Sequence, residues 1–142
     1  MAPISNKPDL ALIQACAVLA ANDAAEDGSF VHALHERDAF DERTFWALYD
    51  AMSVIADTPP RSRKRETQQM AAQVHKAILM HVIYHLNPND SSRIDGFPAD
   101  KLYDWLDRLE WVFNPVVCGK PGYGPGQFND GLPPPRGGYT QH

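Results

Sequence analysis

Apolar residues recur every three or four positions in four long segments of the chain, the spacing of helices that bury one face. A proline or an acidic residue stands near the start of several of these segments. The four predicted helices span approximately residues 8–22, 41–56, 65–86 and 98–114. A short fifth element is expected near residues 30–38, where the turn residues 27–29 weaken the pattern just before it.

The same spacing assigns the faces expected to enter the core. The first helix presents Leu10, Ile13, Ala17 and Ala20, the second Phe45, Leu48, Tyr49, Met52 and Ile55, and the last Leu102, Leu106, Leu109 and Phe113. The third helix differs, because residues 77–86 are apolar on nearly every side. A helix without a polar face must be covered by other helices, so we expect this one at the centre of the fold.

The C-terminal residues 115–142 hold six prolines and seven glycines. This composition excludes helix and sheet, and the last helix is expected to end at Asn114-Pro115. Apolar side chains in the tail predict an irregular strap, packed on its own bundle or on a neighbouring molecule. The expected fold is all-α, a small single-domain bundle of four to five helices in residues 1–114 with a Pro/Gly-rich strap in residues 115–142.

The 142-residue chain is 44% hydrophobic and 22% charged, which suits one globular domain. Its net charge of −5 disfavours a dedicated duplex-binding protein and favours basic partners. The apolar run 10–21 is as long as a signal-peptide core, but Lys7 is the only cation before it and Gln14 interrupts it. It is also too short for a bilayer, which takes roughly 20 residues. We expect a cytoplasmic protein that does not bind membranes.

The two cysteines, Cys16 and Cys118, lack the spacing of a metal site. They are expected to be idle thiols, and a disulfide between them stays open because it depends on the distance between the two backbones.

His81 and His85 lie one helical turn apart, a workable spacing for two ligands of one metal ion. Zinc or another divalent transition metal needs three or four ligands, and His32 and His35 are the candidates to complete the site. The favoured interpretation is that His81 and His85 are hydrogen-bonded residues of the core or of a groove. A metal-dependent enzyme or metal sensor is the alternative.

Four cations cluster between the second and third predicted helices: Arg61, Arg63, Lys64 and Arg65. Cations at a helix N-terminus oppose the helix dipole, so their placement hints at an external use such as nucleic-acid binding. Binding through one such loop would be weak and strongly dependent on salt. A solvated loop that pairs with nearby acids is the favoured interpretation.

The last predicted helix carries acids beside two large aromatic residues. These residues, Asp100, Asp104, Asp107, Glu110, Trp105 and Trp111, are the candidates for a protein-binding surface, since aromatic residues anchor interfaces and charged residues form their rims. No catalytic motif is evident. The sequence therefore favours a small cytoplasmic interaction protein that binds and inhibits, neutralises or scaffolds another macromolecule. A homodimer is also compatible with the pattern.

Overall fold

Short polar side chains begin three of the helices. Asp9 accepts a hydrogen bond from the Leu12 backbone N–H at 3.3 Å, Ser29 from His32 at 3.1 Å, and Asp41 from Thr44 at 3.4 Å. Each of these contacts satisfies a backbone donor that the first turn of a helix leaves without an intrahelical partner.

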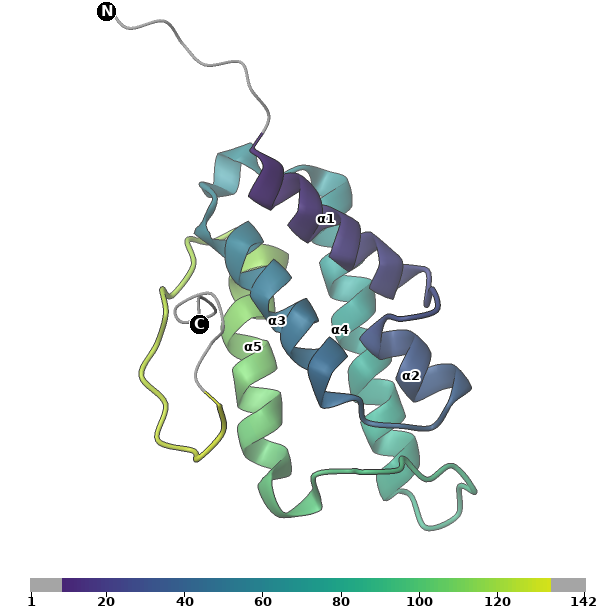
Figure 1. Ribbon diagram of the computed structural model, residues 1–142. Coiled ribbons are helices and arrows are strands. Elements are labelled where there is room, and N and C mark those ends of the chain that lie inside the picture. The colour runs from purple at the N-terminus through teal and green to yellow at the C-terminus, as the bar shows by residue number, and fades with distance from the viewer. Residues whose placement is uncertain (1–8, 134–142) are drawn as a thin grey trace, which may run out of the picture.

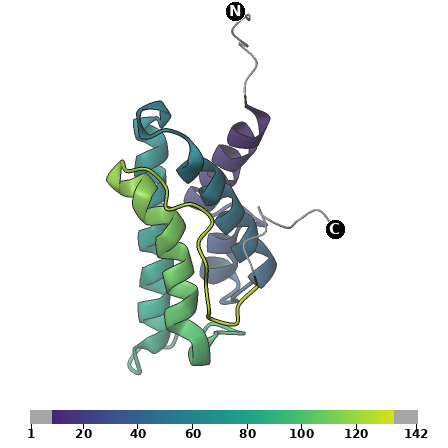
Figure 2. The ribbon, with the colours of Figure 1, turned by 90° about the vertical axis from the view of Figure 1, so that its left-hand side faces the viewer.

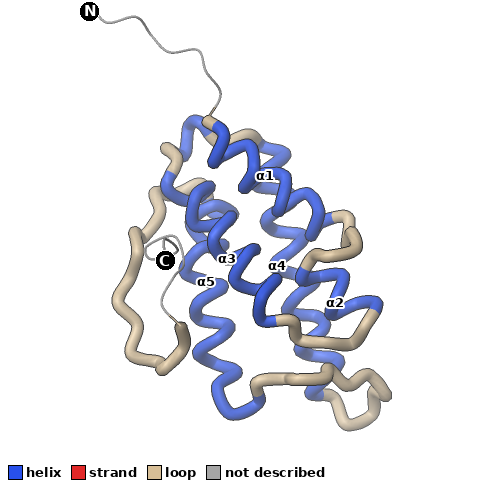
Figure 3. Tube along the Cα trace, in the orientation of Figure 1, coloured by secondary structure: helices blue, strands red, loops and turns tan. Residues whose placement is uncertain are grey.

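The structure, a computed structural model, describes residues 9–133 as helices joined by loops (Figures 1 and 3). The α-helices are α1 (Leu10–Asp23), α2 (Phe30–Glu36), α3 (Glu42–Asp57), α4 (Arg65–Leu86) and α5 (Leu102–Cys118), with short 3-10 helices η1 (Pro60–Ser62) and η2 (Ala99–Lys101). This arrangement confirms the all-α prediction, including the short element near residues 30–38. Pro8 and residues 134–142 lie outside the described part.

One core holds the helices together. α1 packs against α3 and α4, and α5 packs against the same two helices. Aromatic rings from three helices and a loop form its centre, with Phe45 and Trp105 having ring centroids 4.7 Å apart. The ring cluster comprises Phe30, Phe40, Phe45, Trp46 and Trp105. The predicted face of α3 is buried throughout.

Two predicted faces are wrong. α1 buries Ala15, Leu19 and Asn22 instead of the predicted set, because a helix that is apolar on all sides does not specify which side enters the core. The apolar half of α4 is not central either, since Ile83 and Leu86 are each more than half exposed. The other side of α4 packs against α1, α2 and α5.

The predicted end of the last helix is also wrong. α5 continues through Pro115 to Cys118, and Gly119 then takes the left-handed conformation with φ of 67°. The Gly119 N–H bonds to the Val116 carbonyl and the Lys120 N–H to the Pro115 carbonyl. This is the Schellman arrangement, which ends a helix efficiently when glycine occupies the left-handed position.

Residues 119–133, called the strap below, pack on their own chain between α3 and α5 (Figure 2). Trp111 lies 4.8 Å from the Tyr123 ring and 5.4 Å from the Phe128 ring, and its indole N–H donates to the Gly124 carbonyl at 2.8 Å. The described part of the strap therefore packs on its own bundle, one of the two arrangements that the sequence left open.

A buried ion pair fixes the far end of the strap. Arg108 is almost fully buried and donates two hydrogen bonds to the Asp130 carboxylate, at 2.8 and 3.0 Å. The guanidinium also lies 4.0 Å from the Phe128 ring centroid. Hydrogen bonding from Arg108 holds the pKa of the Asp130 carboxyl below its ordinary value. The paired, two-pronged contact is the geometry in which an arginine–carboxylate pair is strongest.

Candidate functional site: the outer face of α4 and α5

Two contacts set the register between α4 and α5. The His75 ring stacks on the Phe113 ring at 5.0 Å between centroids, and the Gln68 side-chain amide donates to the Val116 carbonyl at 3.2 Å. The helices run antiparallel, so the C-terminal half of α4 lies beside the first turns of α5 (Figure 2). Outward-facing residues of these two segments therefore belong to one face of the molecule.

The α5 side of this face is acidic. Tyr103, Asp107 and Glu110 follow one another at spacings of four and three residues, which places them along one side of α5, and Asp100 precedes them in η2. All four are exposed, and Tyr103 is 78% exposed. We call this set the acidic stripe.

The α4 side is apolar. Leu79, Met80, Ile83, Tyr84 and Leu86, called the apolar strip below, are neighbours at helical spacing. Ile83, Tyr84 and Leu86 are 54%, 39% and 56% exposed, and the other two are half-buried. No lysine, arginine or carboxylate occurs between Lys76 and Asn87. Single exposed apolar residues are ordinary, but a contiguous exposed set marks a surface suited to binding.

The structure separates the predicted aromatic anchors from the acids. Trp105 is 7% exposed and belongs to the ring cluster of the core, so it cannot anchor a partner on this face. Trp111 is covered by Tyr123 and Phe128 of the strap. Asp104 is half-buried, and its spacing of three residues from Asp107 places it next to the acidic stripe.

Tyr103 of α5 and Tyr84 of α4 are exposed aromatic residues of this region. Sequence reasoning missed both residues, although the spacing of Tyr103 from the flanking acids would have placed it among them.

The histidines of α4 point to different partners. His85 accepts a hydrogen bond from the Ile94 backbone N–H at 2.8 Å and stacks on Phe97 with centroids 3.8 Å apart. The His81 ring lies 5.5 Å from the His35 ring. Burial lowers the pKa of His81, and the nearby His35 lowers it further.

The remaining predicted metal ligand, His32, donates its Nδ1 proton to the Ala25 carbonyl at 3.0 Å. Within residues 9–133 no three histidine, cysteine, aspartate or glutamate side chains lie close enough to hold one metal ion. The four predicted ligands thus make at most a pair, His35 with His81, in this arrangement. Cys16 and Cys118 are both free thiols.

The basic loop is divided by the fold. Arg63 is buried and donates four hydrogen bonds to carbonyl oxygens: those of Ile55 and Ala56 at the end of α3, Pro115 near the end of α5, and Lys120 of the strap. Burial lowers its pKa. Arg61, Lys64 and Arg65 remain exposed. A nucleic-acid site made of all four cations is therefore incompatible with this structure.

Comparison with known protein families, with curated proteins and with solved structures finds no match for this chain. Among residues 9–133, no helix combines the length and the apolar character needed to cross a bilayer. The face of α4 and α5 combines exposed large apolar side chains with aligned acidic residues.

Proposed function

We propose that this chain is an interaction protein that binds a basic, amphipathic segment of another protein on the outer face of α4 and α5. The observation that carries the proposal is the pairing of the apolar strip with the acidic stripe. An amphipathic helix would place its apolar side over Ile83 and Leu86 and its basic edge beside Asp107 and Glu110. Binding of this kind can inhibit, neutralise or scaffold the partner.

The two free thiols favour a reducing compartment, and a cytoplasmic location is part of the proposal. The acidic stripe is expected to speed association and to make it salt-dependent, because exposed charges steer encounter more than they add affinity. Apolar contacts to α4 supply most of the affinity.

The test is capture of partners from native lysate by the wild-type chain and two charge-reversed variants. Asp107→Lys/Glu110→Lys reverses two acids of the acidic stripe, whereas Asp23→Lys/Glu26→Lys reverses two exposed acids elsewhere. We expect a stoichiometric protein that the first variant loses and the control variant retains. A third variant, Ile83→Glu, should lose the same protein.

Equal capture by wild type and all three variants would contradict the proposal. A synthetic helix with leucines at helical spacing and lysines along one edge gives a second measurement, with a peptide of scrambled order as its control. We expect the ordered peptide to bind wild type and not Ile83→Glu, as measured by calorimetry.

A further inference from the structure

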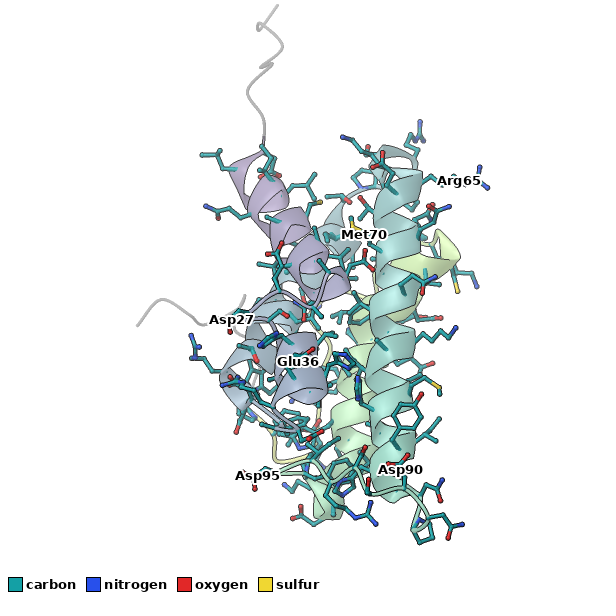
Figure 4. All side chains as sticks on the ribbon, turned by 90° about the vertical axis from the view of Figure 1, so that its right-hand side faces the viewer. Asp27, Glu36, Arg65, Met70, Asp90 and Asp95 are labelled. Atoms are coloured by element: carbon teal, nitrogen blue, oxygen red, sulfur yellow. The ribbon has the colours of Figure 1, made fainter. Side chains whose placement is uncertain are left out.

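A groove of about 480 Å³ opens between α1, the end of α3, η1 and the first turns of α4. Figure 4 shows α1 and α4 diverging toward their N-terminal ends, with Met70 in the space between them. The walls are mostly apolar, with Leu12, Ile13, Cys16, Ala17 and Ala20 from α1 facing Met70 of α4. Size and lining match those of pockets that hold small ligands.

The groove explains why α1 is apolar on all sides. From Leu10 to Asn22 the helix carries no charged residue, yet only Ala15, Leu19 and Asn22 are fully buried. A second apolar side remains, and Ile13 on the wall of the groove is 49% exposed. A ligand that covers this apolar surface removes it from water, which favours binding.

Charge is concentrated at one end of the groove. Lys64 lies on its wall, and Arg61 and Arg65 are exposed beside it in the chain. α4 starts here without a side-chain cap, so its first turn adds partial positive charge. Glu66 is the one carboxylate among the described residues that line the groove. One cationic end followed by an uncharged wall matches a ligand with one anionic head and one apolar chain.

We propose that this groove binds a free long-chain carboxylate, with the head beside Lys64 and the chain along α1 toward Ala20. An acidic amphipathic helix is disfavoured, because it would carry acids along its length and would need cations along the whole groove. The site is separate from the face of α4 and α5, so its test does not depend on the proposed function.

The chain supplies its own reporter for this site. Cys16 lines the groove, whereas Cys118 is exposed at the end of α5 and does not. Alkylation of each thiol by iodoacetamide can be followed by mass spectrometry of the full chain. Bound ligand should protect Cys16 and leave Cys118 reacting at its original rate.

The probe is dodecanoate below its micelle concentration. At a concentration about ten times its Kd, we expect it to slow alkylation of Cys16 about tenfold, because only the unoccupied groove reacts. Dodecyltrimethylammonium, with the same chain and a cationic head, should protect far less. In Arg61→Glu/Lys64→Glu this preference should reverse, and in Arg43→Glu/Lys76→Glu, a control with two exposed cations reversed elsewhere, it should remain.

A variant that fills the groove tests the binding site even if Arg61 and Lys64 contribute little to affinity. Ala17→Trp fills the groove and should abolish protection, whereas Ala11→Trp, exposed on the same helix outside the groove, should not. Absence of protection by dodecanoate in the wild-type chain would overturn the proposal. Protection by anionic phosphatidylglycerol vesicles or by an acidic peptide, without protection by dodecanoate, would also overturn it.

Discussion

Arg63 joins parts of the chain that lie far apart in the sequence. Its guanidinium bonds to carbonyls at the ends of α3 and α5, where the backbone acceptors of a helix lack intrahelical partners. The two helix ends also supply partial negative charge, which compensates the buried cation without a carboxylate. Its acceptors on α5 and the strap lie more than 50 residues away in the chain, so nothing local distinguishes Arg63 from the neighbouring cations.

Replacing Arg63 by alanine should therefore destabilise the protein strongly. Several buried carbonyls would lose their donor, and we expect a loss of about 3 kcal/mol or more in the free energy of unfolding. Arg61→Ala, at an exposed position of the same turn, should change it by less than about 0.5 kcal/mol. Urea denaturation of both variants measures the difference, and equal stability would show that Arg63 is not a structural residue.

Helix positions were predictable wherever a local signal was strong. The range predicted for α4 agrees with the structure, and that for α3 differs by about one residue, because Asp41 caps the start of α3 and Pro88 follows the end of α4. The end of α5 was not predictable in this way. Pro115 lies inside the helix, where its carbonyl accepts hydrogen bonds from Arg63 and from the Lys120 N–H, and the contact with Arg63 is tertiary.

For the face of α4 and α5 too, local spacing predicted some residues, whereas others depend on tertiary packing. Spacing along the last helix gathered Asp100, Asp104, Asp107 and Glu110 into one acidic set, of which Asp104 is half-buried. It could not show that Trp105 belongs to the core, since a tryptophan near an acidic stripe is equally compatible with burial or exposure. The open side of α4 was missed because burial depends on which helices pack around it.

The strap depends on Asp130, and Asp130→Asn should release it. The variant leaves Arg108 buried without its counter-charge, so the strap is expected to dissociate from α3 and α5. Chymotrypsin at neutral pH should then cleave after Tyr123 and Phe128 several-fold faster. Asp100→Asn, the same substitution on an exposed carboxylate, serves as the control, and an unchanged cleavage rate in Asp130→Asn would refute the dependence.

At the scale of the whole molecule, buried neutral histidines make stability dependent on pH. Burial lowers the pKa of His75, where α4 packs on α5, against an opposing effect of Glu110. The unfolded chain, with an ordinary pKa of about 6.5 for histidine, binds more protons than the folded protein as the pH falls. This contribution is complete above about pH 6.5 and decreases below it.

His75→Phe should reduce the pH dependence, because phenylalanine can stack on Phe113 without taking up a proton. We expect the urea midpoint of the wild type to fall between pH 7.5 and pH 5.5, and that of the variant to fall less. Gln73→Phe, which adds a phenylalanine at an exposed position of the same helix and removes no histidine, is the control. If the urea midpoint of His75→Phe fell as much as that of the wild type, the pH dependence would come from other groups, such as His81.

The three tryptophans are divided between two parts of the molecule, which gives the protein two optical signals of its own. Trp46 and Trp105 have ring centroids 5.5 Å apart within a rigid aromatic cluster, so near-ultraviolet circular dichroism reports on core packing. Trp111 lies against the strap, and the wavelength of its fluorescence emission changes when the strap departs and water reaches the indole. Comparing the two signals during unfolding shows, without any label, whether strap and core separate together or in sequence.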